Sequence, residues 1–346
     1  MKKTLFIFAA AALSLAACNK AENSPVINGQ NCHETEPIPV KVQFSGAVTK
    51  ADANDPESKI NSLQVALYRV NGDNKEFESY YNFDPAAMEG TIYIDPDKPA
   101  EKYLIAAYAN QESLTLASIS EDWSLFSNEK SGDFQMYGEW FDLKAKLGST
   151  VEIALNRQCS KVTVRNVSLK WTNSANNHKT FKIESMFLMD VEGVFANVHD
   201  LTSAVQTANP WLNKNGFATN GQDAFLYKDT GSKILTETSG YQTEQVFYGY
   251  VSDLATYNTT SEWAPSGTRL VIEAEFDGKT CYYAVPLWKE GTSAPYRNKH
   301  FIFDNIIITK PGADEPYLPL AVETDVKVSL TVNEWDAVEH GNVTIK

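Results

Sequence analysis

Short segments in which apolar and polar residues alternate recur along most of the chain, and this pattern limits the folds that it can adopt. They are rich in β-branched or aromatic residues and end at turn-forming residues, as at Asp277-Gly278, which predicts a hairpin. A period of two places the apolar side chains on one face of a strand. The sequence therefore predicts strands at residues 40–44, 63–68, 91–94, 103–108, 151–155, 161–167, 181–183, 270–276, 282–285, 301–308 and 326–332.

Helical patterns are confined to short stretches near residues 85–88 and 200–207, and residues 197–239 have the composition of loops. Many short strands with 12% aromatic residues indicate an all-β fold made of β-sandwiches. A chain of 346 residues is long enough for two such domains. We expect an N-terminal β-sandwich at residues 51–165 and a C-terminal one at residues 166–346.

The first 18 residues have the features of a bacterial export signal. Lys2 and Lys3 precede an apolar stretch, residues 5–15, that is too short to span a bilayer. The stretch Leu15-Ala16-Ala17-Cys18 matches a lipobox, which predicts removal of residues 1–17 and lipid attachment to Cys18. Several acyl chains anchor a protein stably to the outer membrane. The alternative is a plain secretory peptide with a coincidental cysteine.

The residues after Cys18 and the overall charge point away from several classes of function. Residues 19–39 are polar and form a tether. The 30 basic and 44 acidic side chains give a net charge of −14, which argues against a nucleic-acid partner. No HExxH, GxSxG or phosphate-binding glycine motif occurs, so we expect neither an enzyme nor a cofactor or metal. Cys159 and Cys281 are expected to be buried thiols.

Several stretches, taken in their order along the chain, resemble the fimbrillin family, the subunits of type V pili. The stretch around Arg157 and Lys161 is similar to a mid-chain strand of that family, and Trp335 lies where the family has a tryptophan near its end. The order and spacing of the stretches carry the resemblance over essentially the whole chain. Besides the lipobox they are residues 48–51, 102–110, 136–139, 155–162, 183–191, 297–301 and 306–312.

The resemblance implies two tandem Greek-key, transthyretin-like β-sandwich domains in a structural pilus subunit that supports adhesion. It also implies a lipid-anchored precursor at the outer membrane, a trypsin-like protease that removes the first strand, and other pilin subunits as partners in a homopolymer on the cell surface. Within residues 18–50 the removable strand would present Val40, Val42 and Phe44. The cut would fall between Lys50 and Ala51.

One departure from the family concerns the cut, which usually follows arginine. This sequence has no arginine before Arg69, so Lys50 is the best candidate, and Lys41 and Lys59 are poorer ones. Residues 49–58 are polar and include a proline, which is typical of an exposed, cleavable segment.

Two C-terminal segments are candidates for the strand that fills the neighbouring subunit. Residues 326–331 have the alternation of residues 40–45, so Val326, Val328, Leu330 and Val332 share one face. If this segment is instead the last strand of its own domain, the donor is the tail, residues 335–346. This tail begins at Trp335, and Val338, Val343 and Ile345 would point inward.

Two other functions fit the same sequence. The chain could be an anchor or tip subunit of the family: an unprocessed lipoprotein would resemble an anchor, whereas the donor-like C-terminus favours a stalk subunit over a tip subunit. A monomeric surface lipoprotein could bind glycans, because exposed aromatic residues such as Trp140, Trp211 and Trp263 can stack on sugar rings.

Overall fold

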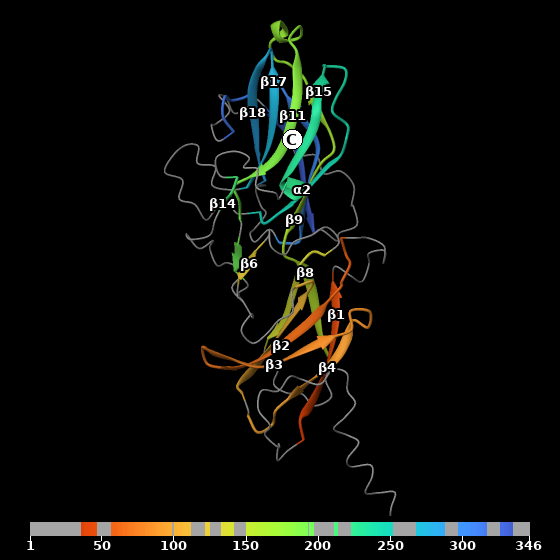
Figure 1. Ribbon diagram of the computed structural model, residues 1–346, viewed down its shortest axis with the longest axis vertical. Helices are drawn as coiled ribbons and strands as arrows, with labels where there is room; N and C mark the ends of the chain where they lie inside the picture. The colour runs from red at the N-terminus through yellow and green to blue at the C-terminus, as the bar shows by residue number, and fades with distance from the viewer. Residues whose placement is uncertain are drawn as a thin grey trace, which may run out of the picture. The chain divides into compact units, whose positions relative to one another are not determined.

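A computed structural model describes the chain in segments, and almost every element is a strand, as the sequence predicts (Figure 1). The exceptions are the four-residue helix α2 (Asp223–Leu226) and a 3-10 turn at Ser174–Asn176. No helix among the described residues has the length and apolar character needed to cross a membrane. The described residues are 36–46, 57–98, 100–111, 122–124, 133–141, 150–192, 194–196, 211–213, 223–251, 268–287, 297–316 and 326–334.

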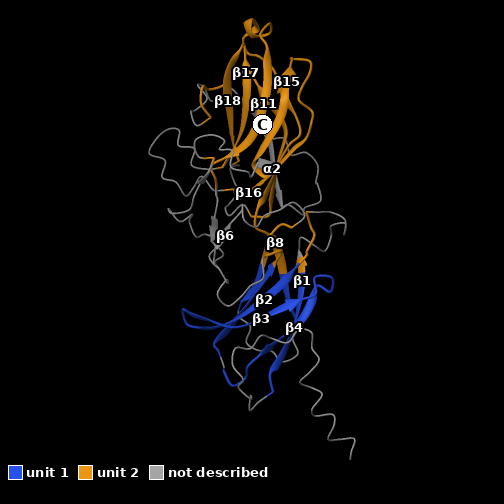
Figure 2. Cartoon of the chain, in the orientation of Figure 1, with its two compact units in different colours: residues 1–44, 62–108, 138–153 blue, residues 45–61, 109–137, 154–346 orange. Residues whose placement is uncertain are grey.

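The chain divides into two compact units, coloured blue and orange in Figure 2. Unit 1 comprises residues 1–44, 62–108 and 138–153, and unit 2 comprises residues 45–61, 109–137 and 154–346. Each unit is thus assembled from three separate stretches of sequence. The predicted domains, residues 51–165 and 166–346, stay a prediction, because compactness does not test which residues fold independently.

Unit 1 contains most of a seven-stranded sheet with the order β3-β2-β5-β7-β8-β1-β4, in which β7 and β8 also include residues assigned to unit 2. The alternation in β8 has the expected effect, because Val151, Ile153 and Leu155 are buried while Glu152 and Ala154 are exposed. The strands are β1 (Ile38–Gly46), β2 (Leu63–Asn71), β3 (Asn74–Phe83), β4 (Glu89–Ile94), β5 (Lys102–Ala109), β7 (Met136–Phe141) and β8 (Thr150–Arg157).

Two tight turns in these sheets follow directly from their residues. The β2–β3 turn contains Gly72 with a φ of 58°, a conformation that glycine adopts at little cost. At the predicted Asp277-Gly278 hairpin, both residues have positive φ, 53° and 77°, as a two-residue turn between right-handed strands requires. This hairpin prediction is confirmed.

Unit 2 contains a five-stranded sheet with the order β10-β19-β9-β16, in which β20 pairs with the opposite edge of β19. Strand β19 is parallel to β9 and β10 and antiparallel to β20. The strands are β9 (Ser160–Val164), β10 (Val167–Leu169), β16 (Gln245–Gly249), β19 (Lys299–Ile308) and β20 (Val326–Glu334).

A four-stranded sheet with the order β15-β11-β17-β18 completes the sandwich of unit 2. Trp171, just after β10, packs its ring against Phe181 and Phe276 of this second sheet, with centroids 5.7 and 5.1 Å apart. The two sheets therefore face each other across an apolar core. The strands are β11 (Phe181–Met189), β15 (Tyr227–Leu235), β17 (Arg269–Phe276) and β18 (Lys279–Pro286), with short pairs β12 (Val191–Glu192) to β14 (Trp211–Leu212) and β13 (Val194–Ala196) to β6 (Asp122–Ser124).

The prediction that residues 197–239 form loops is wrong for residues 227–235, which form β15 at the edge of the second sheet. Its centre, Thr230-Gly231-Ser232, lacks apolar residues and lies where the register with β11 shifts, so pairing of the residues on either side with β11 decides its structure. The all-β class is confirmed. The Greek-key connections and the tandem arrangement stay predictions.

Candidate functional site

Strand β1 lies inside the seven-stranded sheet, between β8 and β4. It pairs with β4 in the antiparallel sense, from Ile38 opposite Ile94 to Gln43 opposite Glu89. Its apolar residues Val40, Val42 and Phe44 are 0%, 0% and 5% exposed, as the alternation predicts. Removing β1 would open a slot between two strands rather than shorten an edge.

The side chains on the other face of β1 make polar contacts with β4. Lys41 Nζ lies 2.8 Å from Glu89 Oε2, and Gln43 Nε2 donates to the same oxygen at 3.1 Å. The hydrogen bond from Lys41, followed by that from Gln43, lowers the pKa of Glu89. These groups are exposed, so their contacts contribute little to stability. They mainly favour the observed register of β1 against β4.

An aromatic pair marks the C-terminal end of the slot. The rings of Phe44 and Phe83 meet edge to face, with centroids 5.8 Å apart. Phe83 also lies over Gly90 of β4, where a Cβ atom would come within 2.7 Å of its ring. Glycine at position 90 therefore provides the space in which Phe83 reaches Phe44.

Strand β4 ends the sheet order, so β1 is its strand neighbour, but side chains of β3 hold it from the other side. Tyr81 OH donates to the Tyr93 carbonyl and accepts from the Tyr93 N–H, both at 3.0 Å. Glu78 Oε1 accepts from the Asp95 N–H at 3.3 Å. Side chains of β3 thus link the two strands at the ends of the sheet order, β3 and β4.

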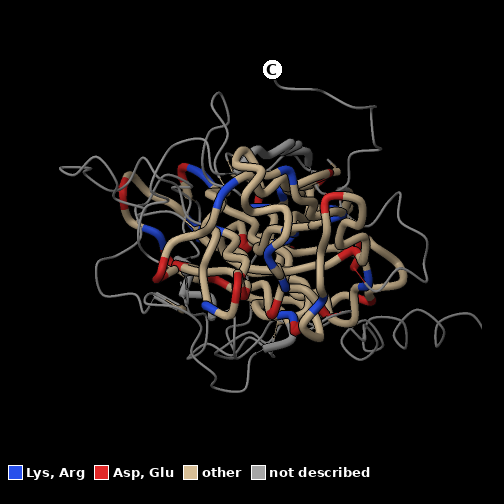
Figure 3. Tube along the Cα trace, turned by 90° about the horizontal axis from the view of Figure 1, so that it is seen from above, with Lys and Arg blue, Asp and Glu red and all other residues tan. Residues whose placement is uncertain are grey.

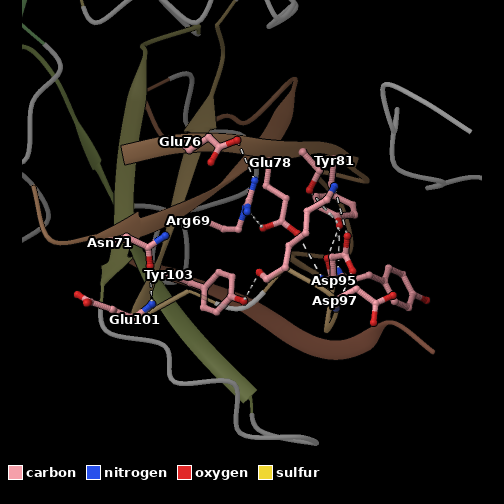
Figure 4. A network of polar contacts seen from close by, with 12 residues as sticks. Arg69, Asn71, Glu76, Glu78, Tyr81, Asp95, Asp97, Glu101 and Tyr103 are labelled. Atoms are coloured by element: carbon pink, nitrogen blue, oxygen red, sulfur yellow. Dashed lines mark hydrogen bonds and ion pairs between the residues drawn. The ribbon is translucent and has the colours of Figure 1, made fainter. Parts of the chain in front are cut away.

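Figure 4 shows the polar network around this junction, which includes Tyr81, Asp95 and Asp97. Arg69 lies between two carboxylates, with Nη2 2.9 Å from Glu76 Oε1 and Nε 3.6 Å from Glu78 Oε2. Burial raises the pKa of Glu78, although the Asp95 N–H and Arg69 act in the opposite direction. Burial also raises the pKa of Tyr81.

The sequence analysis missed Tyr81, Glu78 and Glu89. A signal for the first was present, because Ser79, Tyr81 and Phe83 alternate with more exposed residues in β3. Four of the first five residues of β3, Asn74–Glu78, are polar or charged, so the alternation later in the strand does not stand out. For Glu78 and Glu89 the chain gives no local signal, since their partners come from other strands.

Of the two predicted donor segments, the structure describes only the first. Residues 326–334 form β20, which pairs with the whole of β19, with Val328 opposite Ile306 and Val332 opposite Phe301. In the intact chain this segment is therefore an edge strand of unit 2. Val326 and Leu330 lie on the same strand, opposite Ile308 and Phe303.

Several predicted site residues lie outside the described part of the chain. They are Cys18, Lys50, Ala51, Trp335, Val338, Val343 and Ile345. Their roles stay predictions.

The described residues show no other concentrated chemistry. No group of three or more His, Cys, Asp and Glu side chains in the described ranges is placed to hold a metal ion. Cys159 and Cys281 are both free and buried, as predicted, and burial raises the pKa of the Cys281 thiol. In Figure 3, basic and acidic residues are interspersed along the described chain.

Comparisons with known proteins identify the fold. Neither a family model nor a curated protein matches the sequence. Solved structures do, and the class that they define is the fimbrillin-type β-sandwich protein, so the resemblance found in the sequence is confirmed for the fold.

Three solved structures illustrate the similarity. The fimbrilin FimA of Porphyromonas gingivalis is 17% identical, with a TM-score of 0.60 over 87% of this chain and 98% of that one. A candidate cell adhesion protein of Bacteroides eggerthii is 15% identical, with a TM-score of 0.58 over 89% and 98%. One of Parabacteroides distasonis is 16% identical, with a TM-score of 0.57 over 88% and 98%.

Proposed function

We propose that this protein is a structural subunit of a surface fimbria whose subunits join by exchanging strands. The observation that carries the proposal is the position of β1, which fills a slot between β8 and β4 with three buried apolar side chains. The fold similarity to a fimbrilin supports the same function.

The energetics favour replacement of β1 over an empty slot. Fully burying three apolar side chains stabilises the sheet by roughly 5–9 kcal/mol, and ladder hydrogen bonds add to this. A subunit that has lost β1 leaves the facing edges of β8 and β4 unpaired, which favours addition of a strand from another chain. In such a subunit, the hydrogen bonds of Tyr81 and Glu78 keep β4 attached to β3 until another strand is added.

The proposal includes the route to the surface. The precursor is exported as a lipoprotein, carries lipid on Cys18 and is held at the outer membrane. A trypsin-like protease then cuts between Lys50 and Ala51 and releases the lipid together with β1. The partners of the trimmed subunit are further copies of the same chain.

We assign the donated strand to the C-terminal tail, residues 335–346. Strand β20 already pairs with β19 along its length, so donating it would expose the edge of β19. Donation by β20 stays the alternative, because Val326, Lys327 and Val328 repeat the Val-Lys-Val of residues 40–42.

Trace trypsin treatment of the precursor, followed by an unboiled denaturing gel, tests this proposal. We expect a new N-terminus at Ala51 and a ladder of bands that collapses on heating. A chain that ends at Glu334 should be trimmed in the same way and form no ladder. Trimmed protein that remains monomeric under all conditions would contradict the fimbrial function, and a ladder from the shortened chain would point to β20 as the donor.

One observation favours the glycan-binding alternative. Trp140 and Phe141 at the end of β7 are 41% and 44% exposed, and Lys102 Nζ lies 5.1 Å from the centre of the Phe141 ring. A glycan-binding lipoprotein would stay monomeric after trypsin and be retarded on a polysaccharide affinity gel. The Trp140→Ala variant would then lose that retardation.

A further inference from the structure

The segment that follows the proposed cut does not belong to the unit that contains β1. Strand β1 up to Phe44 and strand β2 belong to unit 1, whereas residues 45–61 between them belong to unit 2. Within this connection the structure describes residues 57–61, which we call the anchor segment. Its contacts with unit 2 decide what remains in place once β1 has been cut away.

The side chain of Glu57 is held by two strands of unit 2. Lys161 Nζ of β9 lies 2.7 and 2.9 Å from its two carboxylate oxygens. Tyr248 OH of β16 donates to Glu57 Oε1 at 2.5 Å. The Lys161 and Glu57 side chains are 18% and 17% exposed, so this ion pair is largely shielded from solvent.

The backbone of the anchor segment is held as well. Arg157, which is 1% exposed, donates from Nε to the Glu57 carbonyl at 2.7 Å. Asn110 is also buried, and its side chain donates to the Lys59 carbonyl and accepts from the Asn61 N–H, both at 2.7 Å. Asn61 Nδ2 further donates to Asp133 Oδ1 at 3.0 Å.

These contacts explain a sequence pattern for which the strand positions alone give no reason. Arg157 and Lys161 are the two basic residues of the 155–162 stretch, and both bind Glu57. Asn110 has a φ of 59°, which asparagine tolerates better than most residues. In this conformation its side chain reaches the Lys59 carbonyl, the Asn61 N–H and the Phe134 carbonyl.

We propose that the anchor segment restricts processing, by denying the bond after Lys59 to a trypsin-like protease and keeping the chain bound to unit 2 from Glu57 onward. A protease needs several residues in extended, unpaired form, so a segment bound through its backbone is cut only when it opens locally. Lys41 is protected in another way, because it lies within the β1–β4 ladder. Lys50 is then the only basic residue left between β1 and the anchor segment.

Cleavage of a Lys50→Gln precursor tests the inference apart from the proposed processing site. We expect very little of the fragment that begins at Ile60 during brief trypsin treatment, as measured by mass spectrometry. Adding Glu57→Ala, which removes the acceptor of Lys161 and Tyr248, should raise the rate of that cut by about tenfold or more. Adding Asn110→Gly, which keeps the backbone conformation but removes three hydrogen bonds, should act in the same direction.

Glu244→Ala is the matched control, since it removes a carboxylate of unit 2 whose ion pair, 3.9 Å from Arg165, does not involve the anchor segment. This variant should leave the bond after Lys59 protected, and thermal unfolding of each variant checks that it is folded. Equal rates of this cut with and without the Glu57 and Asn110 substitutions would overturn the inference.

Only the role of this protection in subunit processing rests on the proposed function; the protection of the Lys59 bond itself does not. If the anchor segment protects Lys59 but trimmed subunits form no ladder, the fimbrial function fails and the protection stands. If Lys59 is cut freely while subunits still polymerise, the protection by the anchor segment fails and the fimbrial function stands.

Discussion

Tyr81 and Glu78 of β3 hydrogen-bond backbone groups of β4 and of Asp95, which directly follows it. While β1 is present, β4 is also held by the ladder that it forms with β1. Once β1 has been removed, the contacts from β3 are the remaining link that keeps one wall of the slot in place. Their effect should therefore be larger in the trimmed protein than in the precursor.

The Tyr81→Phe substitution tests this role. It removes the hydroxyl that both donates to and accepts from Tyr93, and the loss of these two part-buried hydrogen bonds costs about 1–3 kcal/mol. We expect trimmed Tyr81→Phe protein to bind a β1 peptide at least about fivefold more weakly than unmodified trimmed protein, measured by calorimetry. Tyr80 points to the opposite face of β3, so Tyr80→Phe should bind the peptide normally; equal loss in both variants would contradict the role of Tyr81.

The pH dependence of stability should reveal the buried carboxyl of Glu78. Because burial raises its pKa in the folded protein, the folded state binds this proton more readily than the unfolded chain does. The contribution of Glu78 is therefore most favourable below its unfolded pKa and is lost as the pH rises through its folded pKa. Relative to Glu78→Gln, the unmodified protein should gain free energy of unfolding as the pH is lowered from neutral toward the ordinary pKa of glutamate, about 4.3. Urea unfolding measures this free energy at each pH. If the difference between the two proteins stays constant or shrinks on acidification, the prediction is wrong.

At the scale of elements, the proposed function requires that a strand from another chain can replace β1. Its buried residues Val40, Val42 and Phe44 alternate with Lys41 and Gln43, which contact β4 on the other face. A peptide that carries this pattern should therefore enter the slot in the same register.

Complementation by a synthetic peptide checks this expectation. Protein that begins at Ala51 should unfold at a lower temperature than the precursor, and a peptide of residues 36–46 should restore much of the difference. The same peptide with Val42→Asp should not, since an unpaired carboxylate would be buried where Val42 is 0% exposed. The melting temperature is read by circular dichroism, and equal effects of the two peptides would contradict a buried slot.

The elements also show how far the sequence alone could go. The alternating runs correctly located β1, β2, β4, β5, β8, β11 and β17 to β20, because their apolar faces are buried by the sheet and this pattern is visible locally. The sequence predicts one strand at residues 161–167. These residues instead form most of β9 and the start of β10, which pair one after the other along β19. Strand β16 was missed, because its pairing with β9 comes from far along the chain.

The same reasoning applies to the candidate site. The inward face of β1 follows from alternation, and its burial is confirmed. That β1 lies between β8 and β4 could not be foreseen, because a strand's neighbours depend on connections across the whole sheet. The contacts of Glu57 with Lys161 and Tyr248 span more than one hundred residues of sequence, and no local pattern encodes such a contact.

For the whole molecule, net charge would oppose the proposed assembly and strand burial would favour it. Cleavage after Lys50 would remove five lysines and three glutamates, leaving 25 basic and 41 acidic residues and a net charge of −16. Figure 3 shows acidic and basic residues interspersed along the described chain, with no segregation of the two signs that would draw copies together there. Two approaching subunits therefore repel each other through their net charge.

Salt should accordingly speed up polymerisation of the trimmed protein. The screening length falls from about 30 Å at 0.01 M salt to about 10 Å at 0.1 M, so repulsion between whole subunits weakens over this range. We expect the initial rate of ladder formation to rise several-fold across it, as measured by light scattering. The end-capped peptide of residues 36–46 is the control: it carries one glutamate and one lysine and has no net charge, so its binding rate should change little. If polymerisation slows as salt is added, or if its rate changes as little as the binding rate of the peptide does, charge repulsion between subunits does not limit assembly.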